Sequence, residues 1–503
     1  MRTGAPKLQT CMNTSRLTAL LAMAALWATG ARAEERNGWP VRVTELDAAG
    51  QVEKDQWAGP LVYRQPSEEG TVAGLRPVYA RWVDAAGTTR EIDVLYPLFV
   101  YRVSGEWYRW SIFELINKAG PFAGTEDARD GAQSFDVWPF YFSRDTGAPE
   151  STYHAFFPIA GTIKSRFGYD ELAWTLFPLY GRSEKNGAVA TSVLWPFFRV
   201  RQGTVTGWQV WPLYSVREKA GTYREQYFLW PLGWNNTYRK PDAPAGTEPR
   251  REVALLPFYS RETEPGLINE SYLWPFFGYT DRTTKPAYHE IRYFWPFLVQ
   301  GRGDQKEVHR WGPFYTHSVI KGEDKRWVLW PLYREATWAD GAVDRTRAQV
   351  LYFVYWTEEQ RSRANPGAAP AEKTHFWPLY SRWDNGAGRQ QFQFPSLVEV
   401  FFPGNEQVRA NWSPLLTLYR YDRKAPDNVR HEVLWGLLTW RREAERKEFH
   451  LGPLLSVNQQ AAGKRIALGN GLVGLQRGPA GTGWRFFWFD FRGKANKLNA
   501  TSR

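Results

Sequence analysis

The chain has 503 residues, a formal net charge of +12, and a high aromatic content of 27 Trp, 25 Tyr and 30 Phe. Its single cysteine, Cys11, excludes a disulfide-stapled fold and a zinc site built from sulfur ligands. The length would suit several ordinary domains, although a repeat protein need not divide in that way.

The N-terminus has the pattern of a secretory signal peptide. A basic segment is followed by an apolar run at 17–27 and by Ala31-Arg32-Ala33, a small-x-small cleavage pattern. We expect residues 1–33 to be cleaved, which would lower the net charge to +8 and remove Cys11. An uncleaved anchor is disfavoured because the run is shorter than the ~20 residues of a spanning helix. No later stretch approaches such a helix.

From there on, the chain repeats a short motif centred on proline, as in Trp195-Pro196-Phe197-Phe198. Eight steps separate Pro178 from Pro331, a spacing of about 19 residues. Turn-forming pairs such as Asn186-Gly187 lie between the motifs. We take the following residues as structural repeat centres: Pro97, Pro139, Pro178, Trp195, Pro196, Trp211, Pro212, Trp230, Pro231, Pro257, Trp274, Pro275, Trp295, Pro296, Pro313, Trp330, Pro331, Trp377 and Pro378.

One strand and one turn fit this spacing, which predicts an all-β antiparallel up-and-down meander of about 20 or more strands. The repetitive domain covers 34–491, and 492–503 form a polar tail. The central proline leaves two interpretations open, because proline cannot donate to a strand ladder. Each strand bulges at its proline, or each unit consists of two short strands joined there.

A large closed β-barrel is the favoured architecture. Closure would remove the exposed edges of so long a sheet. The spacing between motifs alternates between uniform and variable steps. The longest connections, 240–252 and 357–374, are rich in Pro, Ala and charge, as exposed loops are. Both features are typical of barrels with short turns at one end and long loops at the other. The alternatives are a stacked-hairpin, propeller-like or open-sheet periplasmic protein, since both faces of each motif are apolar and the chain does not end on an apolar strand.

The tandem Trp-Pro-Leu-Tyr and Trp-Pro-Phe-Phe motifs resemble those of a loose group of uncharacterised Gram-negative envelope proteins. The resemblance covers most of residues 95–455. It implies a location in the cell envelope and no known activity.

Motifs of enzyme chemistry are weak. The G-x-G-x-x-G match at Gly469–Gly474 precedes a helix-breaking Gly-Pro pair, so a β-turn explains it better than a dinucleotide site. The S-x-x-K match at Ser318–Lys321 ends a repeat core. His309 and His317 flank Pro313 and would lie far apart on one extended strand. We expect no catalytic residues, no metal site and no cofactor.

Basic side chains follow many repeat cores, as at Arg199, Arg201, Arg217, Arg261, Arg334, Arg382, Arg441 and Arg442. Rings of such charges would suit acidic lipid head groups or lipopolysaccharide, although solvated strand ends explain them as well. Export argues against nucleic acid as a partner. The sequence therefore predicts a non-enzymatic outer-membrane barrel, scaffold or conduit. The alternative is a soluble periplasmic or extracellular module that binds polysaccharide or another acidic glycan, with Trp and Tyr stacking on sugar rings.

Overall fold

A computed structural model describes residues 35–47, 51–122, 132–244, 246–461, 463–478, 481–487 and 489–492. Within these residues the chain forms one sheet of 46 strands. Consecutive strands pair antiparallel, so the sheet is an up-and-down meander and the expected all-β class is confirmed. The expected signal peptide at 1–33 and nearly all of the polar tail lie outside the described residues.

The first strands are β1 (Arg36–Gly38), β2 (Arg42–Leu46), β3 (Val52–Trp57), β4 (Val62–Pro66), β5 (Gly70–Leu75), β6 (Tyr79–Asp84), β7 (Thr89–Val94), β8 (Phe99–Ser104), β9 (Trp107–Ile112), β10 (Ile116–Pro121), β11 (Gln133–Val137), β12 (Tyr141–Asp145), β13 (Tyr153–Phe156), β14 (Ala160–Arg166), β15 (Tyr169–Thr175) and β16 (Tyr180–Lys185). The middle strands are β17 (Ala188–Val193), β18 (Phe198–Gly203), β19 (Thr206–Val210), β20 (Tyr214–Lys219), β21 (Tyr223–Phe228), β22 (Gly233–Tyr238), β23 (Arg250–Leu255), β24 (Tyr259–Glu264), β25 (Leu267–Tyr272), β26 (Phe277–Arg282), β27 (Tyr288–Phe294), β28 (Leu298–Gly303), β29 (Lys306–Trp311), β30 (Tyr315–Ile320), β31 (Glu323–Val328) and β32 (Tyr333–Asp340). The last elements are β33 (Val343–Val350), β34 (Tyr355–Ser362), β35 (Ala371–Phe376), β36 (Tyr380–Asp384), β37 (Gln390–Phe394), α3 (Glu406–Asn411), α4 (Ser413–Leu416), β38 (Tyr419–Ala425), β39 (Asn428–Val433), β40 (Leu438–Glu443), β41 (Arg446–Leu451), β42 (Leu455–Gln460), β43 (Gly463–Leu468), the 3₁₀ turn η1 (Gly469–Gly471), β44 (Val473–Gly478), β45 (Gly481–Phe486) and β46 (Phe489–Arg492).

The prolines of the repeat lie in turns between strands. Pro196 joins β17 to β18, and Pro212 joins β19 to β20. Each 19-residue step is therefore a complete hairpin of two strands of about six residues. Of the two interpretations left open by the sequence, the junction between two short strands is correct, and the strand number is about twice the value of 20.

All of the proline turns lie at one edge of the sheet. In an antiparallel meander alternate connections lie at opposite edges. We define the proline edge as the connections from each odd-numbered strand to the next even-numbered strand, and the polar edge as the remaining connections. The long connections within 240–252 and 357–374 follow β22 and β34, so both belong to the polar edge. The expectation that uniform and variable spacings alternate between two ends was wrong, because each spacing contains one connection of each kind.

The two faces of the sheet differ in side-chain size beside the proline edge. Trp174, Gly181, Ser192 and Arg199 are successive partners in register and so project from one face, which we call face A. Just after the proline turns, face A carries small residues at Gly181, Ser215, Ser260, Gly278 and Ser381. At the preceding position the opposite face carries large ones at Tyr180, Tyr214, Tyr259, Phe277 and Tyr380. The same position on face A carries Arg199, Trp234 and Arg334 in other hairpins, so this difference in size belongs to some hairpins and not to all.

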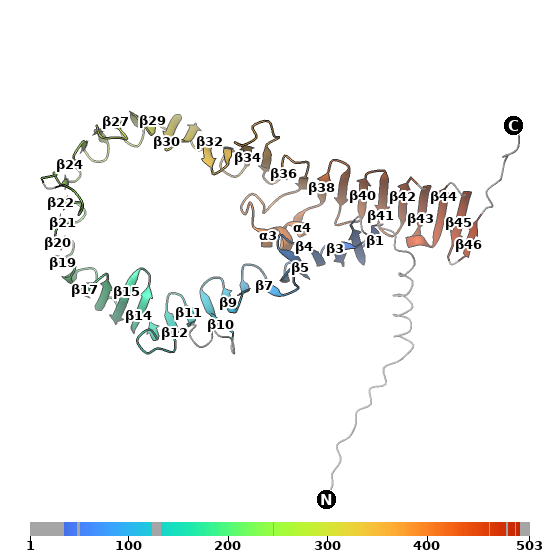
Figure 1. Ribbon diagram of the computed structural model, residues 1–503, viewed down its shortest axis with the longest axis horizontal. Coiled ribbons are helices and arrows are strands. Elements are labelled where there is room, and N and C mark those ends of the chain that lie inside the picture. Colours follow the sequence, from blue (N-terminus) through green and yellow to red (C-terminus); the bar gives the residue numbers. More distant parts are fainter. Residues whose placement is uncertain are drawn as a thin grey trace, which may run out of the picture.

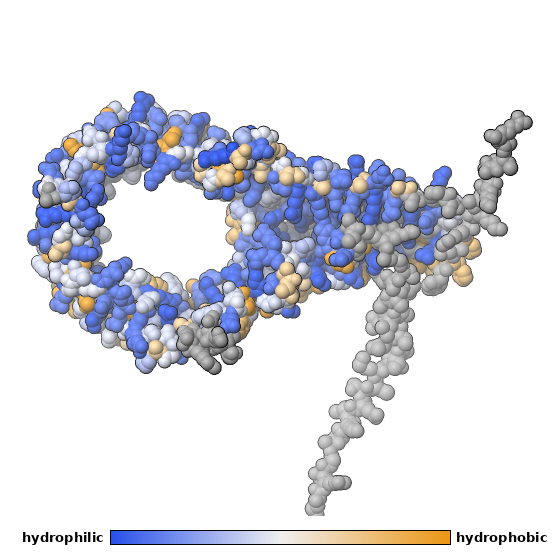
Figure 2. Space-filling model, viewed as in Figure 1, coloured by the Kyte–Doolittle hydropathy of each residue, from blue (hydrophilic) through white to orange (hydrophobic). Residues whose placement is uncertain are grey.

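The sheet curls into a ring whose two ends meet in a stem (Figure 1). The centre of the ring is open in the space-filling view (Figure 2). The expectation of a closed barrel was wrong: β1 and β46 do not pair, and β46 lies at the far end of the stem. The ends of the ring are joined by side chains instead of by a strand ladder.

An ion-pair cluster forms the centre of the stem. Arg430 of β39 lies 3.1 Å from Glu35, 2.7 Å from Glu432 and 3.6 Å from Glu45 of β2. Lys54 of β3 lies 3.5 Å from Glu432. These side chains are largely buried, so each charge depends on its partners for compensation.

Two short helices, α3 and α4, add a second set of contacts, and no helical periodicity in the sequence predicted them. Asn405 caps α3 by accepting a hydrogen bond from the Val408 backbone N–H. Tyr63 of β4 donates to Asn411 Oδ1 at 2.8 Å, and Arg76 donates to the carbonyl of Ala410 at 2.6 Å. The connection that holds the helices thus fastens the early strands to the late ones.

Acid is expected to open the stem. Burial disfavours the charged form of Glu45, but Arg430, Lys424 and Lys54 outweigh that effect and lower its pKa to about 2. A lowered folded-state pKa contributes stability that is present above the ordinary value of 4.5 and is lost as pH falls toward about 2. Small-angle scattering should show the molecule lengthening over this range. The Glu45→Gln variant should respond less steeply, and an identical acid profile in both proteins would contradict this role of Glu45.

Candidate functional site

The turns of the proline edge are joined by backbone hydrogen bonds. The Leu194 N–H donates to Leu179 O at 2.8 Å, and the Trp195 N–H donates to Pro178 O at 2.7 Å. Within the turn, the Phe197 N–H donates to Leu194 O at 2.8 Å, and Pro196 has no N–H. Every backbone N–H of this turn is therefore paired without water.

The tips of these turns expose large apolar side chains. Leu213 is 58% exposed, Phe258 64% and Phe314 67%. The edge continues in both directions with further exposed side chains, including Leu176, Leu179, Leu194, Phe197, Leu229, Leu232, Leu273, Phe276, Phe297, Leu329 and Leu332. The motif tryptophans Trp195, Trp230, Trp274, Trp295 and Trp330 are exposed as well. A continuous apolar edge of this kind is uncommon on a soluble monomer and marks an interaction surface.

Aromatic rings stack from one turn to the next along the same edge. Phe177 lies 5.2 Å from Phe157 and 5.5 Å from Trp195, measured between ring centroids. Trp211 lies 6.0 Å from Trp230. The residues taken as repeat centres from the sequence therefore all lie in turns of the proline edge, where several of their rings contact one another.

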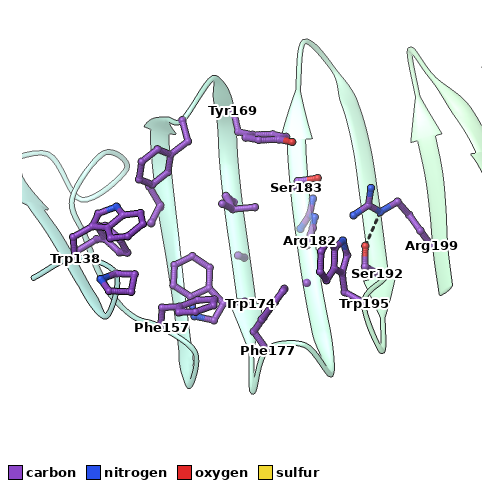
Figure 3. A pocket seen from close by; sticks show the side chains of 17 residues that line it. Trp138, Phe157, Tyr169, Trp174, Phe177, Arg182, Ser183, Ser192, Trp195 and Arg199 are labelled. Carbon is purple, nitrogen blue, oxygen red and sulfur yellow. Dashed lines mark hydrogen bonds between the residues drawn. The ribbon is translucent and has the colours of Figure 1, made fainter. Parts of the chain in front are cut away.

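An aromatic pocket of about 410 Å³ opens on face A beside this edge (Figure 3). Its walls come from β12 and β14–β18 with the proline turns below them. Phe142, Ile163 and Trp174 belong to a buried apolar cluster that lines the pocket, and Phe177 packs against that cluster. Arg199 lies on the opposite side from Trp138, whereas the Arg182 side chain leaves β16 from the face opposite face A, because Arg182 follows Gly181 in the strand. One side of the pocket is thus apolar and the other carries the cation of Arg199.

Of the eight basic residues expected to form charged rings, two are paired across strands: Arg217 lies 2.5 Å from Glu225, and Arg261 lies 3.1 Å from Glu270. Arg382 and Arg441 form ion pairs within their own strands. Such pairs explain half of the basic pattern as support for the sheet. The sequence could not show the pairing across strands, because the partners lie on neighbouring strands.

Arg199 and Arg201 form no ion pair with a carboxylate in the described part of the chain, a feature they share with Arg334, which donates to Gln349. Arg199 donates to the Ser192 hydroxyl at 2.8 Å, and Arg201 makes one long contact of 3.4 Å with Gln209. Nη1 of Arg201 is buried without a hydrogen-bond partner within the described part of the chain. Burial, with the nearby charges of Arg199 and Arg217, lowers the pKa of Arg201 to about 10. Arg199 lines the pocket, and Arg201, two positions further along β18 on the same face, lies just outside its lining; we call the two arginines the cationic cluster.

The other sequence motifs have structural explanations. Gly469–Gly471 is a 3₁₀ turn that leads into β44, and Ser318 lies in β30, away from any helix start. His309 and His317 are direct cross-strand partners, so the expectation that they lie far apart was wrong because the chain reverses at Pro313. Their nearest acidic partners are Glu307 and Asp324. No group of three metal-ligating side chains occurs among the residues described.

Within the described ranges no helix has the length and apolar character needed to span a bilayer. Comparison with protein-family models and with curated proteins found no match for this chain.

Replacement of Arg201 is expected to change the stability less than replacement of Arg217. Arg201→Met removes a desolvated cation that lacks an anionic partner, so the free energy of unfolding should change by less than about 1 kcal/mol. Arg217→Met leaves the buried Glu225 without its cation and should cost about 1–3 kcal/mol. Thermal unfolding followed by circular dichroism measures both. A larger loss for Arg201→Met than for Arg217→Met would contradict the pairing described above.

Proposed function

We propose that the protein is a non-enzymatic scaffold of the cell envelope that lies on a membrane with the proline edge inserted into the lipid. The export signal predicted at 1–33 and the resemblance to Gram-negative envelope proteins support the outer membrane as that membrane. The observation that carries the proposal is the run of exposed Leu, Phe and Trp side chains along one edge.

The backbone of the proline edge is suited to an apolar environment. An unpaired N–H in hydrocarbon costs several kcal/mol. Hydrogen bonds from turn to turn pair at least one N–H of each turn with the turn before it, and the proline in each motif contributes no N–H. Transfer of the proline edge from water into hydrocarbon therefore costs little free energy for the desolvation of backbone groups.

The composition of the edge also resembles that of membrane interfaces. Trp is enriched where hydrocarbon meets head groups, and Leu and Phe supply the inserted surface. The polar edge differs, with turns such as Asn186-Gly187 and Lys321-Gly322. The sheet is thus amphipathic from edge to edge, which gives it a defined orientation on a membrane.

A triple variant at the turn tips tests insertion. Leu213→Gln, Phe258→Gln and Phe314→Gln change side chains that are well exposed, so folding should be preserved. Each loses roughly 1 kcal/mol of transfer free energy, and together they should weaken binding to phosphatidylethanolamine and phosphatidylglycerol vesicles by about tenfold or more. Vesicle flotation measures the bound fraction.

The matched control changes exposed apolar side chains away from the proline edge: Val52→Gln, Val200→Gln and Ile320→Gln. This variant should float with vesicles as the unmodified protein does. The proposal would be overturned if the turn-tip variant and the control variant lost vesicle binding equally, or if the turn-tip variant floated as well as the unmodified protein. Retention on lipopolysaccharide polysaccharide without flotation would favour the glycan-binding alternative, for which the exposed tryptophans would supply the sugar contacts.

A further inference from the structure

The geometry of the aromatic pocket points to a ligand-binding site for a single anionic amphiphile, with its apolar chain against Trp174 and Phe177 and its phosphate or carboxylate held by Arg199 and Arg201. This inference goes beyond membrane association, because it concerns one bound molecule and does not require the proline edge to insert.

The apolar half of the site is already formed. Ile163 is 2% exposed and Trp174 is 6% exposed, so the floor of the pocket is held by the protein's own packing. Trp174 is oriented by a hydrogen bond from its indole N–H to Phe156 O at 3.2 Å. A volume of about 410 Å³ lies within the range of small-molecule sites, which are mostly apolar with a few polar groups that fix orientation.

The cationic half has unused hydrogen-bonding capacity. No carboxylate lies within ion-pairing distance of Arg199 or Arg201 in the part of the chain that the structure describes, whereas the neighbouring Arg217 is paired with Glu225. The buried Nη1 of Arg201 could donate to an anion. Phosphate and carboxylate are the groups that guanidinium ions bind most strongly, through charge-assisted hydrogen bonds.

The two halves are close enough for one ligand. Ser192 and Arg199 are register partners on β17 and β18, and Gly181 separates them from Trp174 along the same row of face A. Figure 3 shows Arg199 and Ser192 on one side of the pocket, with Phe177 and Trp174 at its base. An extended molecule lying across β15–β18 would contact both groups.

Titration calorimetry with dodecyl phosphate below its micelle concentration tests the site. We expect saturable binding to the full-length protein, and at least tenfold weaker binding to the double variant Arg199→Gln, Arg201→Gln. The control, Arg224→Gln with Arg302→Gln, removes the same charge from exposed positions outside the pocket and should bind normally. Equal binding by both double variants would overturn the role of the cationic cluster.

A second variant fills the pocket and leaves the arginines in place. A Cβ atom added at Gly181 meets no atom closer than 3.9 Å, and the position lines the cavity, so Gly181→Leu should fold and place its side chain in part of that space. It should lose dodecyl phosphate binding. Unchanged binding to this variant, or absence of saturable binding to the unmodified protein, would overturn the site.

Further ligands define which chemistry is recognised. Laurate binding as tightly as dodecyl phosphate would support a site for fatty acids, and a preference for dodecyl phosphate would support a lipid phosphate. Equal binding of dodecyl maltoside would overturn the requirement for an anion, and equal binding of inorganic phosphate would overturn the requirement for a chain. If the protein binds dodecyl phosphate in calorimetry but does not float with vesicles, the proposal of membrane insertion is overturned and the ligand site is retained.

Discussion

The hydrogen-bonded ladder of turns along the proline edge is the constraint on which the rest of the molecule depends. From the first hairpin to the last, each turn of this edge donates at least one backbone N–H to the turn before it. The ladder fixes the spacing of neighbouring hairpins at a place where water would otherwise be needed to satisfy the backbone. Apolar side chains can therefore occupy the tips, the rings of successive turns can stack, and the pocket has a base.

Joining of the ring depends on different physics. The stem places several ionised groups in a region that is nearly closed to solvent, with Arg430 between three carboxylates. Buried ion pairs contribute little net stability compared with apolar packing, but removal of one partner is costly. The ion pairs of the stem consequently select one register between the two ends of the sheet, because a shifted register would leave buried charges without partners.

The sequence predicted the class and the repeat but left open whether the proline lies within a strand or between two strands. The spacing of 19 residues fits two strands of about six residues with two turns, which is closer to ordinary strand length than one long strand. The contacts that join the two ends of the ring could not be predicted from the sequence. Asn37 donates to the carbonyl of Gly436 in the stem, and the two residues are separated by 399 positions. The cationic cluster was visible only as part of a general basic pattern, because pairing across strands decides which arginines lack a partner.

The hairpins of the ring follow one another in strict order, each hydrogen-bonded only to the strands that precede and follow it. The circumference of the opening is therefore set by the number of hairpins between the two halves of the stem. Duplication or deletion of one 19-residue unit would widen or narrow the opening while leaving the stem contacts and the turn-to-turn ladder intact. Tandem repetition thus gives this architecture an adjustable diameter without a new fold.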